Sequence, residues 1–209
     1  TIAGSYAQTM NNIIDAPGDI AFVGYEHDGS SGYAFVFIDN CPPGTTIILD
    51  DEEWGGFTSG WQSTSGEGAN TWTNDTDNII PKGTVIKVEN GNSNPTATFG
   101  SVTESDSGFN LGAEDAVFAY VGAFRTTGVT FLAMVGDPDN PGIQTLEDTG
   151  LILGLHAFDI DNIVGDDEGI YTGSINCNGT ATECLQMINN SANWSGIGGG
   201  ITFPSSVPD

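Results

Sequence analysis

The sequence predicts an all-β protein, an antiparallel β-sandwich or jelly roll with long loops and one short C-terminal helix. Short apolar runs rich in β-branched and aromatic residues recur along its 209 residues, and clusters of Gly, Pro, Asn, Asp and Ser separate them. Patterns typical of helices are scarce, and neither a linker nor a repeat divides the chain. We therefore expect a single domain over residues 1–209, with extended arms at about 1–15 and 198–209.

The first predicted strands form a hairpin. Residues 20–25 (IAFVGY) and 33–38 (YAFVFI) flank the turn HDGSSG. The turn CPPG leads to a strand over residues 45–49, and a long loop rich in Gly, Ser and Trp follows over residues 50–78. After the turn PKG, side chains alternate between two faces over residues 84–89, which predicts another strand.

The second half of the chain carries further strand signals and the helix. The strand segments are 96–99, 115–121, 130–135 and 151–153. A short helix is predicted over residues 182–188, because Thr182 has the character of an N-cap and the apolar Leu185 and Ile188 follow at helical spacing.

Acidic residues dominate the charge of the protein. There are 28 Asp and Glu against three basic residues, Lys82, Lys87 and Arg125, and the net charge is −25. Nucleic acids and anionic membranes bind through clusters of Lys and Arg, so we exclude both as partners. No apolar run approaches the roughly 20 residues that cross a bilayer, so membrane insertion is not expected. An acidic surface favours divalent cations and cationic partners, and it also keeps an extracellular protein soluble.

Three stretches of the chain resemble a secreted all-β domain that recurs in bacterial surface and exported proteins. The first, PGDIAFVGY with YAFVFI, is similar to the GDIAFVGY and FAFV motifs of that family. The second, PGTTI with DDEEW and SGEGANTWT around Glu67, is similar to its PAGT, Trp and GEG motifs. The third is FNLGAEDAVFAY, with TFLAMVGD and INNSANWSG after it. The resemblance implies an exported all-β module, extracellular or at the cell surface, with no established catalytic residues.

Cysteines and glycosylation sequons are consistent with an extracellular location. Cys177 and Cys184 bracket a short polar loop and can form a disulfide, which leaves Cys41 either buried and free or bonded to another chain. No Cys or His spacing typical of zinc is present. Four sequons would carry N-glycans if the source glycosylates: Asn74, Asn178, Asn189 and Asn193.

Two oxygen-rich loops predict calcium binding. The segment FDIDNIVGDDEG carries five carboxylates, which repel one another unless water or a cation neutralises them. Calcium takes about six to eight oxygen ligands from carboxylates, amides and backbone carbonyls. The segment DPDN offers similar chemistry, and a solvated surface loop is the alternative in both places. The predicted ligands are Asp159, Asp161, Asn162, Asp166, Asp167, Glu168, Asp137, Asp139 and Asn140.

We do not expect an enzyme. The two histidines, His27 and His156, are not accompanied by a G-x-S-x-G nucleophile motif, and no HExxH, P-loop or GxGxxG motif occurs. The acidic run from Asp50 to Trp54 offers paired carboxylates of the kind used by glycoside hydrolases. Because acidic residues occur along the whole chain, such a pair carries little information.

The predicted function is that of a secreted structural or adhesive subunit, stabilised by Ca²⁺, that self-assembles into an extracellular polymer or surface layer. Sheet edges pair with other chains unless residues such as Lys protect them, and a terminal arm can add a strand to a neighbour. The first alternative is a module that binds extracellular polysaccharide, and an acidic hydrolase is the second. In the first alternative Trp54, Trp61 and Trp72 stack on sugar rings, although the same residues could cap one end of the sandwich.

Overall fold

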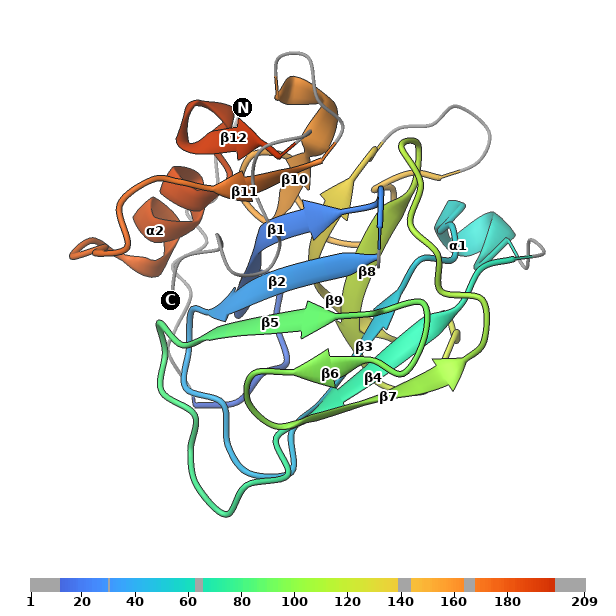
Figure 1. The fold of residues 1–209 in the computed structure, drawn as a ribbon, viewed down its shortest axis with the longest axis horizontal. Helices are drawn as coiled ribbons and strands as arrows, with labels where there is room; N and C mark the ends of the chain where they lie inside the picture. Colours follow the sequence, from blue (N-terminus) through green and yellow to red (C-terminus); the bar gives the residue numbers. More distant parts are fainter. Residues whose placement is uncertain (1–11, 30, 63–65, 139–143, 164–167, 198–209) are drawn as a thin grey trace.

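Two sheets of six strands each pack face to face in this protein (Figure 1). The computed structural model describes residues 12–29, 31–62, 66–138, 144–163 and 168–197. The predicted all-β sandwich is confirmed.

The strands are divided between the sheets as follows. The first sheet, nearer the viewer in Figure 1, contains β1 (Ile20–Glu26), β2 (Gly32–Phe37), β5 (Val85–Glu89), β6 (Thr96–Ala97), β11 (Gly169–Tyr171) and β12 (Trp194–Gly196). The second contains β3 (Thr46–Asp50), β4 (Ala69–Thr73), β7 (Ser101–Asp106), β8 (Ala116–Val121), β9 (Thr130–Gly136) and β10 (Ala157–Asp159). The helices are α1 (Gly56–Ser59) and α2 (Ala181–Ile188), with short 3₁₀ turns η1 (Ile160–Asn162) and η2 (Ser191–Asn193).

The strand order is β12-β11-β1-β2-β5-β6 in the first sheet and β10-β9-β8-β3-β4-β7 in the second. Neighbouring strands are antiparallel except β9 and β10, which are parallel. The strands predicted from apolar alternation agree with β1, β2, β3, β5, β8 and β9 to within about one residue at each end. The segment 151–153 is not a strand, since only Leu153 makes an isolated bridge, to Ala157.

Aromatic side chains fill the space between the sheets. On β2, Tyr33, Phe35 and Phe37 alternate with smaller residues and point inward. Trp72 enters from β4, and its ring lies 5.8 Å from the Phe35 ring and 5.5 Å from the Phe37 ring. The period-two pattern of β2 therefore places its large aromatic residues on the core side.

The outer face of the second sheet is also apolar, and the long loop after β3 covers it. Phe118, Tyr120 and Phe131 lie on this outer face and form a second buried cluster. Trp54 and Trp61, from the loop, pack against Phe131 at ring distances of 5.1 and 5.7 Å. Part of the region predicted as a long loop, residues 50–78, thus packs on the sheet, and residues 69–73 of it form strand β4.

The short helix α2 begins at Ala181, one residue before the predicted start. Thr180, not Thr182, is the N-cap, and it forms a reciprocal capping box with Glu183. A disulfide joins Cys177 and Cys184, so the helix is tied to the loop before it. Buried apolar residues of α2 pack toward β1 on the outer face of the first sheet.

Two further sequence features are placed by the fold. Residues 12–15, assigned to the N-terminal arm from the sequence, contact the body: Ile14 is buried in the core, and the backbone N–H of Asp15 donates to Asp19 Oδ2 at 2.8 Å. Residues 1–11 and 198–209 lie outside the described residues. Cys41 is buried with a free thiol, and burial raises its pKa to about 11.

Candidate functional site

Many loops meet at one end of the sandwich, because the strands run antiparallel. Tyr25, at the end of β1, donates its hydroxyl proton to the carbonyl of Gly112 at 2.8 Å, just before β8. Asp137, after β9, donates its backbone N–H to the carbonyl of Asp115. The bond of Tyr25 joins the two sheets at this end, and the bond of Asp137 joins β9 to β8 within the second sheet.

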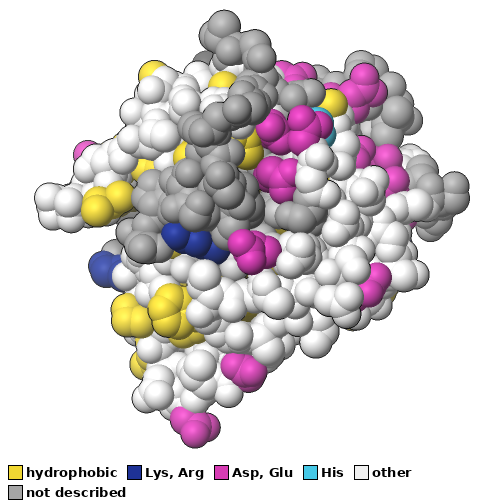
Figure 2. Space-filling view, in the orientation of Figure 1, with side chains coloured by type: hydrophobic (Ala, Val, Ile, Leu, Met, Phe, Trp, Pro, Cys, Tyr) yellow, Lys and Arg dark blue, Asp and Glu magenta, His cyan; other side chains and the backbone are white. Residues whose placement is uncertain are grey.

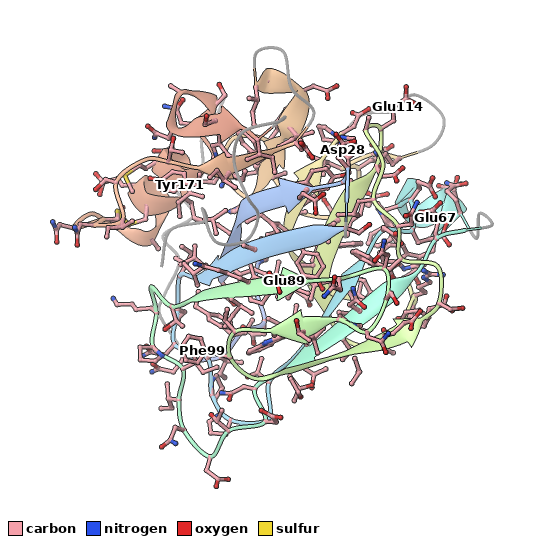
Figure 3. The ribbon with its side chains drawn as sticks, viewed as in Figure 1. Asp28, Glu67, Glu89, Phe99, Glu114 and Tyr171 are labelled. Carbon is pink, nitrogen blue, oxygen red and sulfur yellow. A yellow bond between two sulfur atoms is a disulfide. The ribbon has the colours of Figure 1, made fainter. Side chains whose placement is uncertain are left out.

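Carboxylates from these loops gather there, and we call the group the acidic end. Asp28, Glu67 and Glu114 come from three different loops on this side of the molecule in Figure 3. In Figure 2, acidic side chains are concentrated on the same side of the face in view. The acidic end comprises carboxylates that share Arg125 or whose charges act on one another: Asp50, Asp51, Glu52, Glu53, Glu67, Asp106, Glu114 and Asp115.

Arg125 neutralises the most deeply buried of these carboxylates. Its guanidinium lies 2.9 Å from Asp50 Oδ1, 3.2 Å from Glu52 Oε2 and 3.1 Å from Asp106 Oδ2. Tyr120 donates a further hydrogen bond to Asp50 Oδ2 at 2.8 Å. The side chains of Asp50 and Glu52 have no exposed surface. Burial raises the pKa of Asp50, and the bonds from Arg125 and Tyr120 oppose that shift.

This network gives a structural role to Asp50 and Glu52, two of the four acidic residues in the run that the sequence analysis considered for a hydrolase. Asp50 and Glu52 share one guanidinium and are closed off from solvent, so neither carboxylate faces a substrate. Arg125 itself has a φ of 47°, an uncommon backbone conformation for a residue with a side chain. The surrounding contacts therefore hold Arg125 in place against a backbone cost.

Asp51 and Glu67 form a second pair of perturbed groups. Asp51 accepts backbone hydrogen bonds from Gly68 at 2.6 Å and from Asn110 at 2.7 Å. Burial raises the pKa of Asp51 to about 7, although these two bonds lower it. Burial also raises the pKa of Glu67 to about 8, with the negative charges of Asp51 and Asp115 adding to the effect. Both carboxyl groups therefore take up protons near neutral pH.

The two predicted calcium loops begin next to each other in space, which the sequence did not indicate. Asp159 pairs with Gly136 across the parallel strands β10 and β9, so Asp137 and Asp159 leave the sheet side by side. Burial raises the pKa of Asp159, and the charges of Asp161 and Asp137 raise it further. One oxygen of Asp159 accepts the backbone N–H of Asp161 at 3.1 Å.

The other predicted calcium ligands either lie outside the described residues or make different contacts. Asp139, Asn140, Asp166 and Asp167 lie outside the described residues. Glu168 is buried and faces the loop after β1, where it accepts the backbone N–H of Asp28 at 3.4 Å. Within the described ranges, no group of three or more His, Cys, Asp and Glu side chains is arranged to hold a metal ion.

The tryptophans predicted to stack on sugars are buried. Trp54 and Trp72 have no exposed surface and Trp61 has 9%. Each indole N–H donates to a backbone carbonyl. The acceptor is Glu147 for Trp54, Phe99 for Trp72 and Thr126 for Trp61. The prediction of a sugar platform is therefore wrong for all three, because each ring fills an apolar layer of the fold.

Two of the predicted glycosylation sites are inaccessible in the folded chain. The amide nitrogen of Asn74 is buried and donates to the carbonyls of Cys41, Pro42 and Asn78. Asn189 is buried as well, and its amide donates to two backbone carbonyls.

The remaining sequons differ from each other. Asn193 is half-buried and donates to the carbonyl of Met187 at 2.8 Å. Asn178 is fully on the surface, beside the disulfide. Of the four predicted positions, Asn178 is thus the one with an exposed side chain.

Comparison of the chain with models of known protein families, with curated proteins and with solved structures finds no match. The resemblance to a secreted bacterial domain stays a prediction. No helix of the described residues has the length and apolar character needed to cross a membrane.

The sequence reading missed the role of Arg125. A signal was available, since a single arginine among 28 acidic residues is expected to be ion-paired. Its partners were not readable, because Asp50 lies 75 positions away along the chain.

We expect Arg125→Met to lower the free energy of unfolding at pH 7 by about 3–5 kcal/mol, because it leaves buried carboxylates without a counter-charge. Urea denaturation measures this loss. As a matched background, the same substitution in a chain that already carries Asp50→Asn and Glu52→Gln should cost clearly less. A loss below about 1 kcal/mol in the single variant would show that the network is not structural.

We expect the melting temperature to fall as the pH rises from about 5 to 9. The folded-state pKa values of Glu67 and Asp51, about 8 and 7, lie above the ordinary 4.5 and 3.8. Their stabilisation is complete below about pH 4 and is lost as the pH rises through 7 to 8. Glu67→Gln should raise the melting temperature at pH 9 and flatten the profile, measured by calorimetry. Glu104→Gln, at an exposed site on β7, is the control, and equal slopes in both variants would contradict the assignment.

Proposed function

We propose that this protein is a secreted, non-enzymatic structural or adhesive subunit that assembles into an extracellular polymer or surface layer through the edges of its sheets. The main support is the composition of the four edge strands, β6, β7, β10 and β12. Their sequences are TA, SVTESD, AFD and WSG, without a single Lys or Pro. Lys and Pro are two of the features that protect sheet edges, together with other charged side chains and very short edge strands. Three of the four edges have only two or three residues, so β7, which carries Glu104 and Asp106 but no Lys or Pro, is the one long edge.

Strand β7 is the best acceptor edge. It has six residues, whereas the other three edge strands have two or three. It pairs with β4 on one side only, and Thr103 and Glu104 are exposed. A strand of this length offers a row of backbone N–H and C=O groups to an incoming chain.

The first eleven residues are the complementary element. The segment TIAGSYAQTMN contains no Asp, Glu, Lys or Arg. Two copies of a chain with net charge −25 repel each other, and an uncharged segment approaches the second copy with the least Coulomb cost. One arm and one edge per copy produce a head-to-tail contact, which propagates into filaments.

The competing functions lose their support at specific residues. A polysaccharide module based on Trp54, Trp61 and Trp72 has no ring face to offer, because all three are buried. A hydrolase that uses carboxylates of the run from Asp50 to Trp54 would need them to reach a substrate, and Arg125 holds Asp50 and Glu52 in buried ion pairs. The assembly function does not need either feature.

Calcium remains part of the proposal as a stabiliser of the loops after β9 and β10. Asp137 and Asp159 are adjacent there, and their like charges favour a shared cation. The remaining ligands would come from the rest of the two loops and from water. Surface glycans are proposed at Asn178, if the source glycosylates.

We expect the full chain to form polymers as its concentration rises, seen by light scattering and by electron microscopy. Thr103→Lys adds a protecting charge to β7 and should abolish polymers while the melting temperature of the monomer stays within about 2 °C. Thr58→Lys, on the exposed surface of α1, adds the same charge away from any edge and should leave polymers intact. A strict monomer at every concentration would refute the assembly function.

We expect 1 mM Ca²⁺ to raise the melting temperature relative to EDTA, because a ligand bound only by the folded state at about 100 times its Kd adds about 2.7 kcal/mol. Asp159→Asn keeps the oxygen that accepts the Asp161 N–H but removes the charge, and it should remove most of the increase. Asp77→Asn, at an exposed loop position, should not change it. Identical melting in Ca²⁺ and EDTA would exclude calcium.

A further inference from the structure

An apolar groove lies on the outer face of the first sheet, between strands β2 and β5 and the segment that carries the disulfide. Val36, Ile38 and Val85 line it from the side of the sheet. Ile175 and Met187 line it from the segment that carries the disulfide. Tyr171, labelled in Figure 3, lies on the same side of the molecule. The strand register places Val36 opposite Val85, so both side chains point away from the core.

The groove suits a peptide better than a small molecule. Its cavity of about 250 Å³ is smaller than typical ligand pockets, which begin at about 300 Å³. Lys82 is the one charged side chain among its lining residues, and no Asp, Glu or His lines it within the described part of the chain. Ile175 is 68% exposed and lies next to the apolar lining, so it extends the apolar surface of the groove to the outside.

Both lysines of the chain lie on this face. Lys82 lines the groove, and Lys87 on β5 points outward opposite Ala34. In Figure 2, basic side chains lie close to hydrophobic ones on this part of the surface. Lys87 is 9% exposed and points away from the core. A segment that docks here should combine apolar side chains with a negative charge.

Residues 198–209 have that composition. They read GGGITFPSSVPD, with apolar Ile201, Phe203 and Val207, the acidic Asp209 and no basic residue. Two prolines favour an extended backbone, which matches a groove along strands. Residues 1–11 are also apolar but carry no carboxylate, so they complement the lysines less well.

The last described residue follows a strand that lies beside the groove. Ile197 is buried in the core directly after β12. In the neighbouring strand β11, Tyr171 pairs with Trp194 of β12 and lines the groove. The three glycines after Ile197 permit a sharp change of direction, and nine extended residues then span about 30 Å.

We propose that this groove is the docking site of residues 198–209 of the same chain, with Ile201 or Phe203 in the cavity and Asp209 near the lysines. The contact is intramolecular and is independent of the arm-to-edge assembly proposed above. It fastens the C-terminal segment to β2 and β5 and closes an apolar surface that would otherwise be open to other proteins.

A photo-crosslinking residue, p-benzoylphenylalanine, tests the contact in the full chain. Placed at Ile175, on the exposed wall, it should crosslink to residues 198–209 within monomers, identified by mass spectrometry of the peptides. Placed at Thr103 on β7, the same probe should not crosslink to that segment. Phe203→Ser should reduce the Ile175 crosslink by about tenfold or more, because burial of a Phe side chain is worth at least a factor of that size, whereas Ser206→Ala should leave it unchanged.

Each other outcome overturns the proposal in a distinct way. Crosslinks to residues 198–209 that appear only in dimers would assign the groove to a second copy. Crosslinks to residues 1–11 would assign it to the other terminal segment, and absence of crosslinks from Ile175 would leave the groove without this occupant. Thr103→Lys, which is expected to abolish polymers, should not affect the Ile175 crosslink, so failure of the assembly function and failure of this contact are separable.

Discussion

The ion pairs of Arg125 are the interaction on which the acidic end depends. This one side chain connects the end of β3, through Asp50 and Glu52, to the end of β7, through Asp106. Burying carboxylates in a protein interior is costly unless a counter-charge and hydrogen bonds accompany them. Because the only other basic residues are the two lysines on another face, no second residue can replace Arg125. The arrangement of the loops at this end follows from that scarcity.

A second constraint is the apolar outer face of the second sheet. Phe118 and Phe131 would be exposed to water if the loop after β3 projected outward. Trp54 and Trp61 cover them, and the cost of ordering this long loop is offset by the burial of large aromatic surfaces. The large ring surface that made Trp54 and Trp61 candidates for sugar stacking is the surface that covers this face of the sheet.

The strands with clear apolar alternation were predictable from the sequence, and the polar ones were not. Residues ANTWT in β4 bury a single large side chain, and SVTESD in β7 is mostly exposed, so neither carries a run of apolar residues. Tertiary pairing with β3 and with β4 creates these strands. The candidate site was less predictable still. Its residues were identified as oxygen donors, but the proximity of Asp137 to Asp159 and the pairing of Asp50 with Arg125 arise only from the strand order.

The distribution of charge favours one kind of assembly over another. The carboxylates gather at one end of the sandwich, and both lysines lie on the outer face of the first sheet. A two-fold contact places the same patch of each copy against itself and so brings like charges together, whereas a head-to-tail contact joins different patches. For a chain with net charge −25, the head-to-tail geometry carries the smaller repulsion. Salt and divalent cations reduce that repulsion further. Electrostatics and the long β7 edge, which lacks Lys and Pro, therefore favour the same open, filament-forming symmetry.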